Sequence, residues 1–265
     1  MIPIQSSMKL FAKSLIFAGV FVLSLNVSAG QVHKLWYDTP AQVWTEALPL
    51  GNGRLGAMVY GNPANEQIQL NEETIWAGRP NNNANPEARE WIPKIRKLVF
   101  EGRYREAQDM CTAHVKSATN QGMPYQPFGD LRISFPGHGR YDNYYRELSL
   151  DSARTVVRYS VDGVNYTRET FASFPDQVVI TRITSDRPGS VTFNASLTTP
   201  HPDVMIASEG DEITLSGISS NHEGLKGKVE FQGRVTALPK GGRMTSRDGV
   251  ITVENADEAV IYTSI

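Results

Sequence analysis

The chain has 265 residues, of which 40% are hydrophobic and 20% charged, enough apolar residues for a folded core. Lysine and arginine number 26 against 28 aspartate and glutamate, for a formal net charge of −2. This balance argues against binding to a nucleic-acid backbone or an anionic membrane. The single cysteine, Cys111, excludes a disulfide framework within the chain, and no histidine or cysteine spacing is typical of a metal site. We therefore expect no metal and no cofactor.

An export signal is predicted over residues 1–29. Lysines precede an almost wholly apolar stretch from Ser14 to Leu25, and Val27-Ser28-Ala29 suits cleavage between small residues. A run of about twelve apolar residues is too short for a typical membrane span. The alternative is a buried helix. Cleavage after the signal leaves residues 30–265 as one exported domain, periplasmic or extracellular, with no membrane segment.

A glycine-rich apolar segment from Leu48 to Gly61 opens the mature domain. Such spacing of glycine is typical of strands with close backbone approach, bulges or tight turns. Residues 67–70 then alternate polar and apolar, which predicts a half-buried strand that leads into a polar and aromatic segment from Asn71 to Pro80. Two interpretations are open: a core hairpin followed by a polar loop, or one wall of a sugar site.

A pair of helices is predicted near residues 86–116. Asn85 suits the start of the first helix, and Pro93 either kinks that helix or marks its true beginning. The second helix is expected from Arg103 to Val115. Its apolar face includes Cys111 and His114, which we expect to be a buried small side chain and a core histidine with satisfied hydrogen bonds.

From Tyr125 onward the sequence is typical of short strands separated by turns. Asp162-Gly163 and Asp248-Gly249 are strong turn signals between strands. The pattern predicts a mainly β protein, an antiparallel β-sandwich with the helical pair inserted. The expected strands cover residues 131–135, 145–150, 155–161, 164–170, 177–184, 190–197, 212–216, 228–237, 250–253 and 258–265.

A set of residues from about Leu35 onward, densest before Pro80, carries a family resemblance: Trp36-Tyr37, Pro40-Ala41, Trp44, Glu46 to Met58, Gln69 to Glu72, Thr74 to Trp76, Gly78, Pro80, Arg96, Leu98, Gly102, Glu106-Ala107 and Pro127 to Leu131. On these residues the sequence resembles the N-terminal β-sandwich domain of glycoside hydrolase family 95, the α-L-fucosidase-like enzymes.

The resemblance implies a longer enzyme with a helical linker, a catalytic α/α-barrel and a further β region. In such enzymes the general acid and the groups that activate water belong to the barrel, so the resemblance assigns no catalytic residue to this C-terminally truncated chain. It implies that the full-length enzyme removes a terminal L-fucose, or the similar L-galactose, from fucosylated glycans with inversion, and that the fragment alone is inactive. The alternative is a self-standing carbohydrate-binding or scaffold sandwich without catalysis.

Four residues are candidates for substrate binding beside the absent barrel: Asn52, Asn71, Glu73 and Trp76. An indole offers a sugar ring an apolar face, and carboxylate and amide groups can bind its hydroxyls. The alternatives are turn hydrogen bonds for the asparagines, a surface or interdomain salt bridge for Glu73, and core packing for Trp76.

No pair of catalytic carboxylates is evident. Glu72 and Glu73 are adjacent, and neighbouring side chains of a strand point to opposite faces, so they could not both flank one glycosidic bond. Asp203 follows Pro200-His201-Pro202 in a loop, and we expect Asp203 and His201 to be exposed there.

Overall fold

The computed structural model describes residues 33–117 and 122–265, so the predicted export signal lies outside the described residues. The contacts divide the chain after Gln31, and all described elements belong to the unit from Val32 to Ile265. In this described part, no helix is long and apolar enough to span a membrane.

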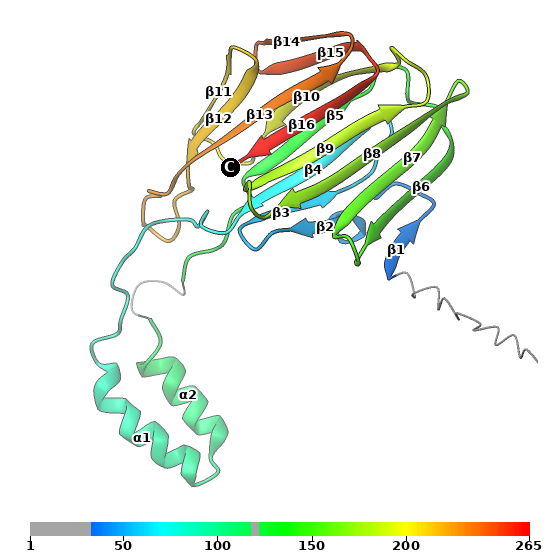
Figure 1. Ribbon diagram of the computed structural model, residues 1–265. Coiled ribbons are helices and arrows are strands. Elements are labelled where there is room, and N and C mark those ends of the chain that lie inside the picture. Colours follow the sequence, from blue (N-terminus) through cyan, green and yellow to red (C-terminus); the bar gives the residue numbers. More distant parts are fainter. Residues whose placement is uncertain (1–32, 118–121) are drawn as a thin grey trace, which may run out of the picture. The chain divides into compact units, whose positions relative to one another are not determined.

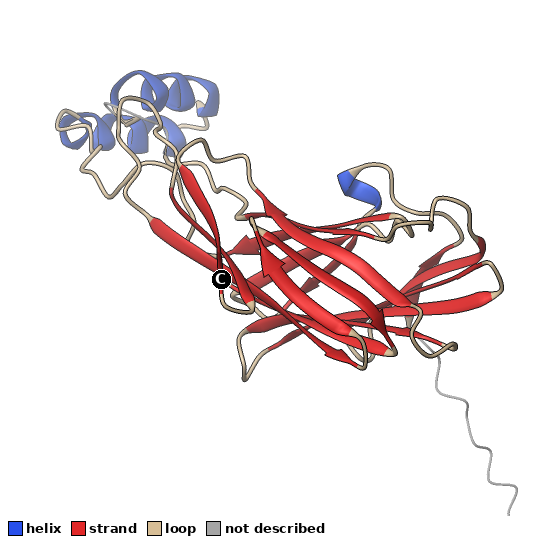
Figure 2. Ribbon diagram, turned by 90° about the horizontal axis from the view of Figure 1, so that it is seen from above, coloured by secondary structure: helices blue, strands red, loops and turns tan. Residues whose placement is uncertain are grey.

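Two antiparallel sheets lie face to face (Figures 1 and 2), which confirms the predicted sandwich. The first has nine strands in the order β1-β6-β7-β8-β9-β16-β13-β12-β11, and the second has seven in the order β14-β15-β10-β5-β4-β3-β2. The strands are β1 Lys34–Tyr37, β2 Leu48–Gly51, β3 Leu55–Val59, β4 Asn65–Glu72, β5 Gly129–Ser134, β6 Asp142–Ser149, β7 Arg154–Val161, β8 Val164–Ser173, β9 Val178–Ser185, β10 Val191–Thr198, β11 Val204–Glu209, β12 Glu212–Ile218, β13 Glu230–Lys240, β14 Arg243–Arg247, β15 Val250–Ala256 and β16 Glu258–Ser264.

Both predicted Asp-Gly turns join adjacent strands. Asp162 and Gly163 have φ of 48° and 73° between β7 and β8, and Asp248 and Gly249 have φ of 52° and 74° between β14 and β15. Two consecutive residues with positive φ form the tight turn that matches the twist of antiparallel strands.

The hydrophobic core fills the space between the sheets, with buried residues at alternate positions of most strands. Phe128, which is fully buried, packs edge-on against Phe231 with ring centroids 5.7 Å apart. A Cβ on Gly233 would lie 2.3 Å from the Phe128 ring, so glycine is required where β13 crosses this aromatic pair.

The predicted helical pair is confirmed as α1 Ala88–Phe100 and α2 Tyr104–His114. Helix α1 begins before Pro93 and continues through it. The expectation for Cys111 is wrong, because its side chain is exposed. His114 is half-buried and stacks on Trp91, with ring centroids 3.5 Å apart and planes at 4°.

Candidate functional site

Loops from both sheets meet at one end of the sandwich. Asn52, in the β2–β3 turn, donates from Nδ2 to the carbonyl of Ser173 at the β8–β9 turn, at 2.8 Å. Arg54 donates to Gln177 Oε1 at 3.4 Å and to the carbonyl of Ile265. These bonds join the turns of two sheets and the end of β16. We call the group formed by Asn52, Arg54, Glu72, Glu73, Trp76 and Tyr125 the Trp76 corner.

Asn52 holds the β2–β3 turn together. Its Oδ1 accepts the backbone N–H groups of Arg54 at 3.1 Å and Leu55 at 2.7 Å. Nδ2 is also bonded to Ser173, so most hydrogen-bonding positions of the Asn52 amide are already used within the protein. Asn52 is a predicted sugar ligand, and these bonds agree with the alternative, a role in turn hydrogen bonding.

The two adjacent glutamates differ in exposure. Glu72 has a side chain only 8% exposed: one oxygen lies 3.2 Å from Arg54 Nε, and the other accepts Thr74 N–H at 2.8 Å and Thr74 Oγ1 at 2.6 Å. Glu73 is exposed, and its carboxylate has no hydrogen bond or ion pair within the described residues. The corner therefore presents one free carboxylate, from Glu73, and not an opposed catalytic pair.

Trp76 is held in place while much of its ring stays exposed. Its Nε1 donates to the carbonyl of Glu73 at 2.9 Å, and its ring meets Tyr125 edge-on with centroids 5.3 Å apart. The exposed fractions are 45% for Trp76 and 41% for Tyr125, so core packing does not account for either ring. Tyr125 donates to the carbonyl of Glu72 at 2.9 Å. Burial, and then the negative charges of Glu72 and Glu73, raises the pKa of Tyr125.

Asn71 points to the opposite face of β4 from Glu72. It occupies the outward-facing row of β4, opposite Gly56 of β3, whereas Glu72 points inward. Its Oδ1 is buried without a hydrogen-bond partner among the described residues, as is Oδ1 of Asp130. Of the four predicted residues, hydrogen bonds through Arg54 link Asn52 to Glu73, and Glu73 bonds to Trp76, whereas no hydrogen bond within the described residues joins the Asn71 side chain to these three.

Sequence reasoning missed two aromatic residues at this end. Tyr125 pairs with Trp76 through an isolated β-bridge, although 49 positions separate them in the chain (125 − 76 = 49). Phe174, in the turn bonded to Asn52, is 71% exposed. An aromatic residue within a turn is visible in the sequence, but single exposed aromatics are common on protein surfaces, so that pattern does not by itself indicate a site.

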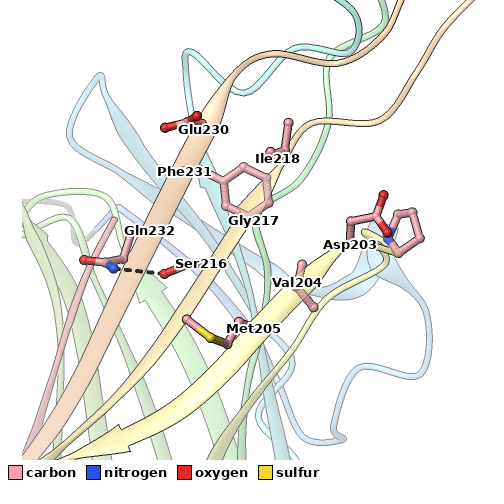
Figure 3. Close-up of a pocket in the computed structure, with 10 residues that line it drawn as sticks. Asp203, Val204, Met205, Ser216, Gly217, Ile218, Glu230, Phe231 and Gln232 are labelled. Atoms are coloured by element: carbon pink, nitrogen blue, oxygen red, sulfur yellow. Dashed lines mark hydrogen bonds between the residues drawn. The ribbon is translucent and has the colours of Figure 1, made fainter.

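Carboxylates and histidines elsewhere are dispersed. His201, expected to be exposed, is only 4% exposed, and its Nε2 lies 2.9 Å from the carbonyl of Pro127. Asp203 is exposed, as predicted, and lines a cavity of about 730 Å³ on the nine-stranded sheet (Figure 3). Within residues 33–117 and 122–265, no group of three or more His, Cys, Asp or Glu side chains could hold a metal ion.

Comparison with protein families identifies the family of this chain. The model described as glycosyl hydrolase family 65, N-terminal domain, matches residues 35–265. The chain belongs to this family. It is 35% identical over 253 residues to alpha-L-fucosidase 2 of Arabidopsis thaliana and 30% identical over 242 residues to a probable alpha-fucosidase A of Aspergillus niger. A probable alpha-fucosidase A of Aspergillus oryzae is 27% identical over 169 residues, which cover 60% of this chain and 22% of that protein.

The first two relatives match 86% of this chain, but the match spans only 29% of their own length. The predicted resemblance to the N-terminal domain of α-L-fucosidase-like enzymes is thereby confirmed, and this chain is a glycosyl hydrolase N-terminal domain.

Proposed function

We propose that this chain serves as the non-catalytic N-terminal domain of an exported α-L-fucosidase-type hydrolase, and that it packs on a catalytic α/α-barrel and contributes the Trp76 corner to the rim of the sugar pocket. The observation that carries the proposal is the half-exposed Trp76 indole, whose Nε1 donates to the backbone carbonyl of Glu73, a residue whose own carboxylate has no partner within the described residues. An apolar ring face next to an acceptor is suited to a sugar that has both a C–H face and hydroxyl donors.

The carboxylates of the corner support a role for this domain in binding sugar, with hydrolysis carried out by another domain. Inverting hydrolysis needs two carboxyl groups roughly 6.5–9.5 Å apart, one as general acid and one as general base. Glu72 is committed to Arg54 and Thr74, which leaves Glu73 as the single free carboxylate of the corner. The corner can therefore position a sugar but lacks the second group. We expect the isolated chain not to hydrolyse an aryl α-L-fucoside.

The substrate class comes from the relatives, whose names identify them as fucosidases. We infer that the full-length protein acts on fucosylated glycans at a terminal L-fucose or L-galactose. Export rests on the predicted signal, and N-terminal sequencing of the mature protein should find it beginning at Gly30.

The test uses the full-length gene product with an aryl α-L-fucoside. Trp76→Ala and Glu73→Gln are expected to raise KM by about tenfold with a smaller change in kcat, because each removes a contact to bound sugar. Trp44→Ala is the matched control, since Trp44 is 53% exposed and lies outside the corner.

Unchanged KM in both corner variants would show that the corner does not touch the substrate. Turnover by the rigorously purified fragment, abolished by Glu73→Gln, would instead place catalysis in this chain. A fragment that ends at its own stop codon and binds glycans would support the alternative of a self-standing carbohydrate-binding sandwich.

A further inference from the structure

A groove with free hydrogen-bonding groups crosses three strands of the nine-stranded sheet, at β11, β12 and β13 (Figure 3). Its volume is about 730 Å³. We call it the β11–β13 groove. Its lining residues are Pro202, Asp203, Val204, Met205, Ser216, Gly217, Ile218, Glu230, Phe231 and Gln232.

The strand register arranges the groove side chains in two rows. Met205 pairs with Ser216, and Ser216 pairs with Gln232, which forms one row across the three strands. Ile218 pairs with Glu230 in the next row, and Asp203, one residue before β11, lies on the far side of Ile218 (Figure 3). On β13, Glu230 and Gln232 are exposed and alternate with buried residues, so both rows face away from the core.

Two carboxylates flank an apolar centre. Neighbouring strands lie about 4.8 Å apart, so the backbones at Asp203 and Glu230 are separated by roughly 10 Å. Ile218, between them, is 44% exposed, and Met205 in the adjacent row is 63% exposed. Neither carboxylate has a hydrogen bond or ion pair to another described residue. The groove therefore offers acceptors on two sides and an apolar surface between them.

The adjacent row supplies donors as well. Gln232 Nε2 donates to Ser216 Oγ at 2.9 Å, and Gln232 Oε1 accepts Arg234 Nε at 3.1 Å. One amide hydrogen of Gln232 and the hydroxyl hydrogen of Ser216 remain to be donated. A ligand that satisfies the whole groove must both donate to carboxylates and accept from an amide and a hydroxyl.

We propose that the β11–β13 groove binds a neutral monosaccharide ring, as a second sugar site separate from the Trp76 corner. Ring hydroxyls donate to Asp203 and Glu230 and accept from Gln232, while ring C–H groups contact Ile218 and Met205. An alkylammonium satisfies only the carboxylates, because it has donors and no acceptor. The proposal concerns the chain as it stands and does not depend on the catalytic domain.

The test is an NMR titration of the 265-residue chain with methyl α-L-fucoside, methyl β-D-galactoside and methyl β-D-glucoside, and with n-butylamine as a cationic probe. At least one glycoside should give saturable shifts with a low-millimolar Kd, as expected of an open groove with few contacts. The shifts should centre on residues 203–205, 216–218 and 230–232.

Variants assign the binding to the groove. Asp203→Ala and Glu230→Gln should each weaken it about tenfold, because a charge-assisted hydrogen bond is lost or reduced. Glu209→Gln is the matched control, since Glu209 is an exposed carboxylate of the same β11 strand outside the groove and should leave Kd unchanged.

Four results would overturn the proposal: no saturable shift with any glycoside at tens of millimolar, shifts with n-butylamine alone, sugar binding that both groove variants leave unaltered, or shifts confined to residues 52–76. Shifts confined to residues 52–76 would transfer sugar binding to the Trp76 corner. That result would support the function proposed for the corner while refuting the groove site.

Discussion

The ion pair between Arg168 and Glu66 bridges the two sheets, from β8 to β4, with both side chains only 2% exposed. Arg168 Nη2 lies 3.3 Å from Glu66 Oε2 and donates to the carbonyl of Asn62 at 2.8 Å. The other oxygen of Glu66 accepts the N–H groups of Gly61 at 2.7 Å and Gln67 at 3.0 Å. Removing one partner leaves the other charge buried without its counter-ion.

Arg168→Met is expected to lower the free energy of unfolding by about 3–5 kcal/mol, because it leaves the buried Glu66 carboxylate without the Arg168 guanidinium. For a domain of this size that corresponds to a fall in Tm of about 6–20 °C. Glu66→Gln should lower the free energy of unfolding by a smaller amount. Burial already raises the pKa of Glu66, and the Arg168 guanidinium keeps its contacts with the rings of Phe135 and Tyr159, at 5.0 and 5.2 Å.

A double-mutant cycle tests this reasoning. Urea unfolding of the wild type, Arg168→Met, Glu66→Gln and the double variant, followed by tryptophan fluorescence, gives the coupling free energy. The double variant should be more stable than the sum of the single effects predicts, by about 1–3 kcal/mol, because it leaves no buried charge unpaired. Additivity within about 0.5 kcal/mol would show that the two charges do not stabilise each other.

Three further predictions concern stability. Gly233→Ala should lower the free energy of unfolding by about 1–3 kcal/mol because its Cβ meets a buried ring at 2.3 Å, whereas Gly139→Ala, with open space around it, should change little in the same urea assay. Burial, and then the positive charge of Arg168, lowers the pKa of His138 from its ordinary 6.5. The unfolded chain therefore binds more protons below pH 6.5, and stability measured against pH should fall as pH drops below that value, a slope that His138→Gln should reduce. Asn52→Ala removes the hydrogen bonds of the turn and should lower the free energy of unfolding, measured by thermal unfolding, by about 1–3 kcal/mol. Asn52→Asp keeps the two hydrogen bonds to Oδ1 and should lower it by less.

The strands that the sequence predicts best have a buried face and a local turn signal. Residues 155–161 and 164–170 alternate on either side of Asp162-Gly163, and the structure has β7 and β8 there. The missed strands β1, β11 and β14 all lie at sheet edges. An edge strand pairs on one side only and buries little, as in β1, where every residue is exposed, so its hydrophobic alternation is weak.

The site was less predictable than the fold, because its geometry comes from contacts that are distant in the chain. The sequence indicated a polar and aromatic segment after β4, and the structure holds Trp76 there. It could not indicate that Tyr125 returns to pair with Trp76, or that Asn52 reaches across to Ser173. Cys111 was misjudged because helical spacing identifies a face without showing what covers that face.

Backbone hydrogen bonds connect the segment that follows Trp76 with the loop that borders the β11–β13 groove. Gly78 N–H donates to the carbonyl of Ser220 at 2.8 Å, and Lys228 N–H donates to the carbonyl of Gly78 at 2.9 Å. Both partners belong to the loop between β12 and β13, which leaves the groove at Ile218 and returns to it at Glu230. These hydrogen bonds connect the segment after the indole to the loop between two groove residues. The two surfaces are therefore linked through the β12–β13 loop, although different side chains carry the sugar contacts proposed for each.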